Sequence, residues 1–165
     1  MQHQIYQNFT NKLADFTQDL GRVYQSLEEL ARDLVGHKLF TLMSVDKNKG
    51  EAARIFSNMP EAYPIFGKKP VTNTPWSKRV IDNHETFVAN DISEIAAVFD
   101  DYQLIQSLGC ESVINVPIVI GAQVIGTINC LAEAGHYTRE RKLASEALKL
   151  PGAACFLCHL SKPKA

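Results

Sequence analysis

The stretch ESVINVPIVIGAQVIGTINCL, residues 111–131, contains two strongly apolar runs on either side of Gly121 and Ala122. Each run is long enough for a β-strand, and glycine at the first loop position is typical of a two-residue type II′ turn. The stretch therefore predicts a buried antiparallel hairpin. Each strand also carries one asparagine, Asn115 or Asn129, and a buried amide requires hydrogen-bond partners or a ligand.

The expected turn also sets a register for this hairpin. Pairing Ile120 with Gln123 places Asn115 opposite Ile128. Because cross-strand partners share a face and faces alternate along a strand, Asn115 and Asn129 should point to opposite sides of the sheet. We expect Asn115 to face a ligand pocket and Asn129 to be held by hydrogen bonds on the other face. A loop one residue longer would place both amides on one face.

Residues 5–35 predict one long N-terminal helix, because their apolar residues alternate spacings of three and four. Such a stripe packs on its own domain or pairs with a partner subunit. The sustained seven-residue repeat favours pairing, so we expect a homodimer. Its interface would be formed by Leu13, Phe16, Leu20, Val23, Leu27 and Leu30.

The segment between the helix and the hairpin predicts most of the remaining sheet, whose core spans about residues 37–131. Apolar and small residues fill both faces of residues 39–45, which indicates a central strand, and residues 51–58 predict a shorter second strand. Four prolines interrupt residues 59–75, so we expect a long irregular loop of the kind that often covers a binding site.

Helix caps divide the rest of the chain. Thr74 and Asp91 each precede a helical pattern, and ETFVAN, residues 85–90, predicts a short strand between these helices. Thr138 begins a final helix over about residues 138–160, which Pro151 and Gly152 should kink or interrupt. The element order predicts a single α+β domain over residues 1–165, with an antiparallel sheet flanked by helices.

Composition narrows the classes of partner. The chain has 165 residues and a formal net charge of -1, which provides no electrostatic basis for binding nucleic acid or a membrane surface. The N-terminus does not resemble a signal peptide, and no apolar run is long enough to span a membrane. We expect a cytoplasmic protein whose four cysteines are free.

The hairpin and its surroundings resemble the GAF domain family. The resemblance is carried by Val116-Pro117-Ile118 on one strand, the Gly121 turn, and Val124-Ile125-Gly126 on the return strand. The segments FVANDI (87–92) and YTRE (137–140) also resemble elements of the family. The resemblance covers about residues 20–160. It implies a central antiparallel sheet of five to six strands, as in profilin and PAS domains. The N- and C-terminal helices would pack on one face.

The resemblance also implies a sensory module that binds an unidentified small molecule between the sheet and the helices covering one face. It would form a homodimer through its terminal helices and act on a separate signalling protein. The candidate ligand-binding residues are Ser44, Phe56, Trp76, Asn90, Asp91, Phe99, Tyr102, Cys110 and Asn115. Two alternatives are a ligandless dimerisation module and a thiol enzyme that reduces free methionine sulfoxide through Cys110. We favour a protein that is not an enzyme.

The sequence leaves any cofactor unknown and predicts no haem, metal or nucleotide. The CFLCH segment, residues 155–159, matches a haem-attachment pattern, but it lies in an apolar helix without a secretory signal. Cys155 and Cys158 lack a second ligand pair for zinc, and the sequence has no glycine-rich phosphate-binding loop. Cys110 has no neighbour that would activate a thiol, so a buried apolar role is the simpler interpretation.

Overall fold

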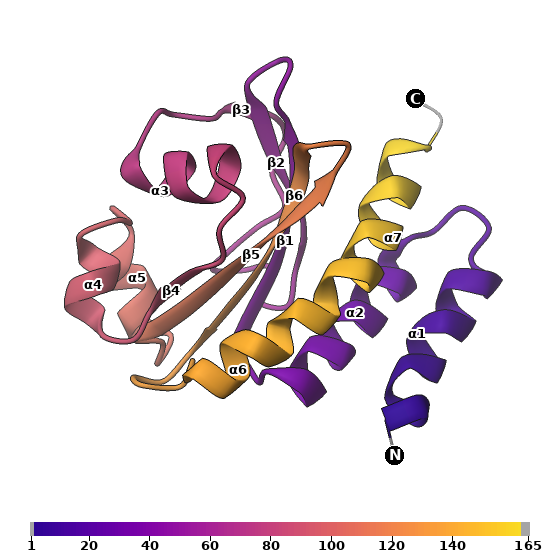
Figure 1. The fold of residues 1–165 in the computed structure, drawn as a ribbon, viewed down its shortest axis with the longest axis horizontal. Helices are drawn as coiled ribbons and strands as arrows, with labels where there is room; N and C mark the ends of the chain where they lie inside the picture. Colours follow the sequence, from indigo (N-terminus) through magenta and orange to yellow (C-terminus); the bar gives the residue numbers. More distant parts are fainter. Residues whose placement is uncertain (1, 163–165) are drawn as a thin grey trace.

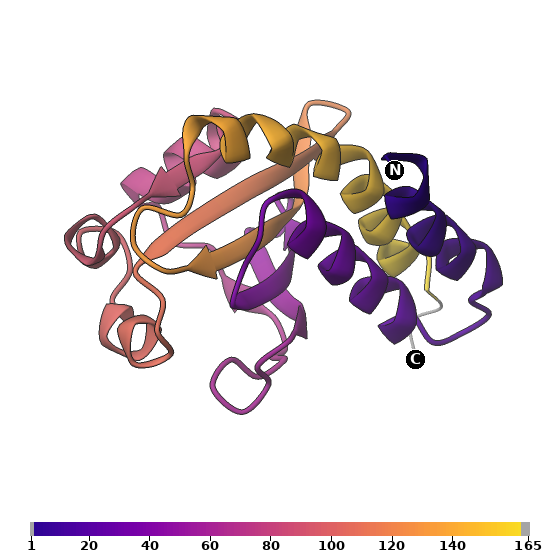
Figure 2. The same ribbon diagram turned by 90° about the horizontal axis from the view of Figure 1, so that it is seen from below.

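A computed structural model describes residues 2–162 as a three-layer α+β fold. A six-stranded antiparallel sheet forms the middle layer in these residues, with strand order β3-β2-β1-β6-β5-β4. Helices α2, α6 and α7 cover one face of the sheet, and α3, α4 and α5 lie on its other side (Figure 1). The predicted fold class is confirmed, and α1 and the C-terminal part of α7 lie on the same side of the molecule (Figure 2).

The strands and helices follow the apolar pattern of the sequence. The strands are β1 (Leu39–Asp46), β2 (Glu51–Ser57), β3 (Lys69–Pro70), β4 (Phe87–Ala89), β5 (Ser112–Ile120) and β6 (Gln123–Ala132). The helices are α1 (Gln2–Asp15), α2 (Gly21–Leu34), α3 (Pro75–Ser77), the π-helical η1 (Lys78–Asp82), α4 (Ile92–Ala96), α5 (Tyr102–Ser107), α6 (Arg139–Ala144), the 3-10 turn η2 (Ser145–Leu148) and α7 (Lys149–Leu160).

The β5–β6 hairpin has the predicted two-residue turn but not the predicted register. Ile120 pairs with Gln123, and Gly121 and Ala122 have φ angles of 58° and 61°, so both loop residues have positive φ and the turn is not type II′. A bulge follows on β6, where Ile125 is an extra residue. This residue shifts the pairing by one position, so Asn115 lies opposite Asn129. The prediction that the two amides face opposite sides was wrong.

The N-terminal segment forms two helices rather than the predicted single helix over residues 5–35. The chain turns at residues 16–20, where the Asp19 side chain accepts a hydrogen bond from the backbone N–H of Gly21 at 2.8 Å. Helix α1 then packs beside α2 and buries Phe9 (Figure 2). Folding back removes apolar surface of α1 from water, which a continuous helix of a single chain would leave exposed.

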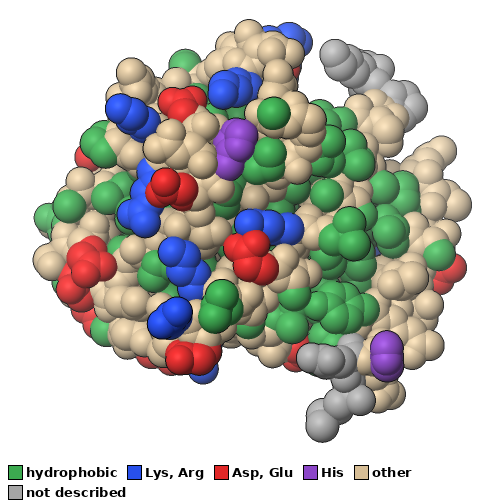
Figure 3. All heavy atoms as spheres, viewed as in Figure 1, with side chains coloured by type: hydrophobic (Ala, Val, Ile, Leu, Met, Phe, Trp, Pro, Cys, Tyr) green, Lys and Arg blue, Asp and Glu red, His purple; other side chains and the backbone are tan. Residues whose placement is uncertain are grey.

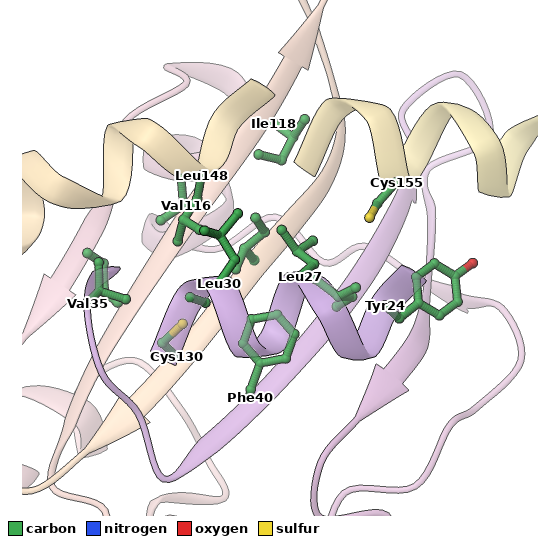
Figure 4. Packing of buried hydrophobic residues seen from close by; sticks show 14 of the residues in the cluster. Tyr24, Leu27, Leu30, Val35, Phe40, Val116, Ile118, Cys130, Leu148 and Cys155 are labelled. Carbon is green, nitrogen blue, oxygen red and sulfur yellow. The ribbon is translucent and has the colours of Figure 1, made fainter. Parts of the chain in front are cut away.

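Helices α2 and α7 and the inward side of the sheet enclose one apolar core. Figure 4 shows Leu27 and Leu30 of α2 facing Phe40, Val116 and Ile118 of the sheet. The backbone of β6 comes close to α7 at one position, because a Cβ atom on Gly126 would lie 2.3 Å from the ring of Phe156. Glycine is therefore needed there to allow the helix to approach the strand.

The C-terminal helical segment is interrupted earlier than predicted. The 3-10 turn at Ser145–Leu148 separates α6 from α7, and Pro151 lies in the first turn of α7. Proline is tolerated in a first turn because the N–H groups there have no partner within the helix. The predicted caps at Thr74, Asp91 and Thr138 are confirmed, since each side chain accepts a backbone N–H from the helix that follows.

Candidate ligand-binding site

A cavity of about 220 Å³ lies between the sheet and the layer formed by α3, α5 and the residue 58–74 loop. Its floor comes from alternate residues of β1, β5 and β6, which share the face of the sheet opposite α2 and α7. The residues that line it are Leu39, Thr41, Met43, Arg54, Tyr63, Trp76, Phe99, Asp101, Ile105, Val113, Asn115, Asn129 and Leu131.

A row of hydrogen-bonded side chains crosses the cavity floor. The Trp76 indole Nε1 donates to Asn115 Oδ1 at 2.9 Å, and Asn115 Nδ2 donates to Asn129 Oδ1 at 2.8 Å. Asn129 Nδ2 then donates to Thr41 Oγ1 at 3.2 Å. Indole nitrogen can only donate, so Trp76 determines which end of each amide faces its neighbour along the whole row.

Trp76 is held in this position by its own helix terminus and by two aromatic neighbours. Thr74 and Ser77 form a reciprocal capping box, with Ser77 N donating to Thr74 Oγ1 at 3.1 Å. The Trp76 ring meets Phe99 edge to face at 6.3 Å, and Phe99 meets Phe87 of β4 at 6.1 Å. These contacts restrain the indole ring, so the amide row has a rigid starting point.

The mouth of the cavity carries charged groups and a loop contact. The Tyr63 hydroxyl donates to Asp101 Oδ2 at 2.5 Å, which joins the loop after β2 to the start of α5. The Arg54 guanidinium lies 4.9 Å from the Tyr63 ring centre and 4.8 Å from that of Phe66. Its Nη1 donates to the Pro64 carbonyl at 2.9 Å.

Burial changes the acid–base chemistry of two of these groups. It lowers the pKa of Arg54, because a desolvated cation is disfavoured. It also raises the pKa of Tyr63, an effect that the hydrogen bond to Asp101 reinforces. The Tyr63 phenol therefore remains a neutral hydrogen-bond donor across the physiological pH range.

The cavity combines apolar walls with a few convergent polar groups, as small-molecule sites do. Within residues 2–162 no group of three or more His, Cys, Asp or Glu side chains could hold a metal ion. The arrangement provides binding and orientation of a small organic molecule.

Three of the predicted ligand-binding residues, Trp76, Phe99 and Asn115, come together in the cavity. The other six do not line it. Ser44 and Phe56 project from the strands elsewhere, with Phe56 packed against Tyr24 and Phe40 on the helical side. Asp91 is an exposed helix cap.

Asn90, Tyr102 and Cys110 also lie outside the cavity wall. Asn90 Nδ2 donates to the Tyr137 carbonyl at 3.0 Å, and the Tyr137 backbone N–H donates to Asn90 Oδ1 at 3.0 Å. These two hydrogen bonds tie the end of β4 to the segment before α6. Tyr102 is partly buried and packs against the apolar cluster that contains the cavity walls. Cys110 is fully buried, and burial raises the pKa of its thiol, the opposite of what a reactive thiolate requires.

Several cavity residues escaped the sequence interpretation. Thr41 could have been found from strand alternation, because it shares a face with Leu39 and Met43 and pairs with Asn129. Arg54 and Asp101 carry charges that usually indicate solvent exposure, and Tyr63 lies in an irregular loop. No local pattern marks these three, since only the folded loop brings them to one place.

The residues predicted to form a dimer interface pack within their own chain instead. Leu20, Val23, Leu27 and Leu30 are 0–2% exposed and belong to the core of their own chain, and Leu13 and Phe16 pack partly buried against it. The stripe thus stabilises the domain itself, which is the alternative to subunit pairing that its pattern allowed. None of the helices in the described residues is long and apolar enough to cross a membrane.

Comparison with known proteins agrees with this architecture. A family model described as GAF domain matches residues 17–150. A search of curated protein sequences found no match.

Solved structures provide matches over nearly the whole chain. The GAF domain of an Acinetobacter phosphoenolpyruvate-protein phosphotransferase has a TM-score of 0.72 and 10% identity, covering 99% of this chain and 97% of that one. A GAF domain/HD domain protein from Geobacter sulfurreducens has a TM-score of 0.67 and 16% identity, and the match covers 90% of this chain and 100% of that one. The GAF domain of a two-component sensor histidine kinase from Bacillus halodurans has a TM-score of 0.66 and 14% identity, and the match covers 87% of this chain and 97% of that one. At these identities the likeness concerns the fold.

Proposed function

Because the chain belongs to the GAF domain family, whose members are sensory or regulatory domains of signalling proteins, we propose that it binds a small organic molecule as a regulatory signal. The observation that carries the proposal is the hydrogen-bonded row from Trp76 to Thr41 on the floor of an otherwise apolar cavity. Within residues 2–162 the row leaves one N–H of Asn115 and one of Asn129 without an acceptor. Buried polar groups normally have partners, and a ligand would provide them.

The sheet offers a direct route from the cavity to the helices on its other face. Asn115 lines the cavity, while its neighbours Ile114 and Val116 belong to the core packed against α2 and α7. A ligand that binds better when the loop held by Tyr63 and Asp101 is closed would shift the population towards that state. The change would reach a separate signalling protein through the α7 side of the domain.

A binding role explains the cavity better than thiol chemistry does. Cys110 does not line the cavity and its thiol is fully buried. The four cysteines are all free, which agrees with the reducing cytoplasm that we propose as the location. We accordingly propose a domain without enzymatic activity of its own.

The experiment that tests ligand binding uses the only tryptophan of the chain. A library of small aromatic and aliphatic compounds would be screened with 15N-labelled protein, following the single indole N–H resonance of Trp76. Binding in the cavity should shift this resonance together with the side-chain amides of Asn115 and Asn129. The proposal is refuted if compounds that bind the protein leave all three signals unchanged.

We also propose homodimer formation through the outer surface of α6 and α7. The residues Leu143, Ala147, Leu150, Ala154 and Leu157 alternate spacings of four and three, and the three leucines are 66%, 82% and 49% exposed. Hydrophobic side chains gather on the side of the molecule where α7 and α1 lie (Figure 3). A largely apolar groove of about 420 Å³, lined by Ile5, Tyr6, Leu34 and Ala147 among others, continues this surface towards α1.

The stripe on α6–α7 can pair with itself. Leu143 and Leu157 lie seven residues to either side of Leu150, so an antiparallel pair of stripes centred on Leu150 places each Leu143 opposite a Leu157. A two-fold interface requires such self-complementarity. The apolar surface would then leave water on dimerisation, which is the main driving force for association.

Sedimentation equilibrium tests the dimer. Leu150→Glu should shift the protein towards the monomer, because it places two carboxylates at the centre of the interface. Leu104→Glu is the matched control, since Leu104 is an exposed leucine of α5 on the other side of the sheet. A wild-type monomer, or equal effects of the two substitutions, would contradict the proposed interface.

A further inference from the structure

We propose that the cavity selects a small carboxylate that carries one apolar ring or branched group. The inference rests on the proposed binding function and adds the charge, size and polarity of the ligand. Three features of the cavity carry it: a cation without an ionic partner, a floor with unused donors, and apolar walls around a small volume.

The cation is Arg54, which lines the cavity from β2. No carboxylate of residues 2–162 lies within 4.0 Å of its guanidinium, whereas ion pairs of this kind occur at several other places in these residues. Asp101, the acid that also lines the cavity, accepts from the Tyr63 hydroxyl and acts on Arg54 electrostatically only from beyond that distance. A half-buried cation without a direct ion pair is costly, and a ligand carboxylate in contact with it would compensate this cost.

The surroundings of Arg54 hold its guanidinium in place. The rings of Tyr63 and Phe66 both lie within 5 Å of it, and the Pro64 carbonyl accepts one of its five N–H groups. Four N–H groups remain, and this planar set of donors matches the two oxygens of a carboxylate. An arginine restrained in this way loses little conformational entropy when an anion binds.

The cavity floor adds further donors. Each Oδ1 atom of Asn115 and Asn129 already accepts one hydrogen bond, and each Nδ2 has one N–H left over. The Thr41 hydroxyl accepts from Asn129 and retains its own hydrogen for donation. Apart from the Asp101 carboxylate, which accepts from Tyr63, the polar groups that a ligand meets are therefore mainly donors, which suits a group that only accepts.

The walls and volume limit the rest of the ligand. Leu39, Met43, Ile105, Val113 and Leu131 surround the polar row with aliphatic side chains. An apolar cavity of about 150 Å³ accommodates benzene, so the volume of about 220 Å³ leaves room for one ring with a small substituent. A dinucleotide or a tetrapyrrole would not fit in this volume.

The test compares benzoate with benzamide and benzylamine, which share its ring and differ in charge. Each compound is titrated into the full chain while the Trp76 indole resonance is followed. We expect benzoate to bind at least tenfold more tightly than benzamide, since a hydrogen bond to a charged group is stronger than a neutral one. Equal binding of benzoate and benzamide, or tighter binding of benzylamine, would overturn the carboxylate assignment.

Variants of Arg54 separate this inference from the binding function itself. Arg54→Gln should weaken benzoate about tenfold or more and weaken benzamide much less, so that most of the preference for benzoate is lost, whereas Arg139→Gln, an equal charge change at an exposed position of α6, should alter neither affinity. Wild-type positions of the Trp76, Asn115 and Asn129 side-chain resonances in the free Arg54→Gln protein show that its cavity is folded. If none of the three compounds moves the Trp76 signal while another library compound does, the carboxylate inference fails and the proposed binding function stands.

Discussion

The close approach of α7 to β6 at Gly126 leads to a strong prediction for Gly126→Ala. The new Cβ atom would lie 2.3, 2.4 and 2.6 Å from three carbons of the Phe156 ring. Carbon atoms in contact are separated by about 3.5–4.0 Å, so the ring must move by roughly 1 Å or the helix must shift. Phe156 is fully buried within the core shared by α2, α7 and the sheet, so a shift of its ring must displace other core side chains.

The expected cost follows from the opposing effects of the substitution. Overpacking a core costs about 1–3 kcal/mol, and three overlaps with a fully buried ring place this case near the upper end. Replacing a strand glycine with alanine stabilises the folded state by about 0.5–1 kcal/mol, because the unfolded chain then has less conformational entropy to lose. We therefore expect a net destabilisation of about 2 kcal/mol, which lowers the Tm of a chain of this size by about 4–8 °C.

Urea unfolding followed by circular dichroism measures this cost, and a double-mutant cycle identifies its origin. Phe156→Leu alone should destabilise the protein by leaving a cavity. The loss in the free energy of unfolding of the double variant should be about 1–2 kcal/mol smaller than the sum of the losses of the two single variants. Gly67→Ala is the matched control, because a Cβ atom there meets nothing within 4 Å. A Gly126→Ala protein as stable as wild type, or additive effects in the cycle, would refute the steric explanation.

Three further predictions concern buried polar groups. Thr127 Oγ1 is buried with no hydrogen-bond partner in residues 2–162, so Thr127→Val should stabilise the protein by about 1 kcal/mol in urea unfolding; a loss of stability would mean that the hydroxyl has a partner. Burial lowers the pKa of His37 below its ordinary 6.5, so the unfolded chain takes up this proton first and the free energy of unfolding should fall as the pH drops below about 6.5. His37→Gln should reduce the change in the free energy of unfolding between pH 7.5 and 5.5. An unchanged pH dependence would mean that other groups cause it, such as His159, whose pKa is also lowered by burial. Tyr63→Phe removes the donor to Asp101, so amide hydrogen exchange in residues 58–68 should become faster while that of β5 stays the same.

Much of the fold could be predicted because its signals are local. The apolar runs around Gly121 predict two strands, and the cap residues at Thr74, Asp91 and Thr138 mark helix starts by chemistry that acts within one turn. The position of Trp76 after one of these caps also made it a reasonable candidate for the cavity. These features depend on neighbours in sequence, so the sequence alone indicated them.

The N-terminal helices show where a local signal has more than one structural solution. The stripe from Leu13 to Leu30 describes a helix with one apolar face, but it does not say what covers that face. In the structure, the stripe of α2 packs on the sheet and α1 folds back beside it. The comparable exposed stripe lies instead on α6 and α7, where Leu143, Leu150 and Leu157 lack partners within residues 2–162.

The sequence by itself determined that this chain forms a helix-flanked antiparallel sheet with an asparagine in each strand of its central hairpin. Only the tertiary structure decided that Asn115 and Asn129 lie side by side on the cavity floor. The reason is the bulge at Ile125: one extra residue reverses the face of every residue beyond it, and alternation along a strand cannot reveal where such a residue falls. Arg54 and Tyr63 likewise reach the cavity only through the path of the folded loop, which no short stretch of sequence encodes.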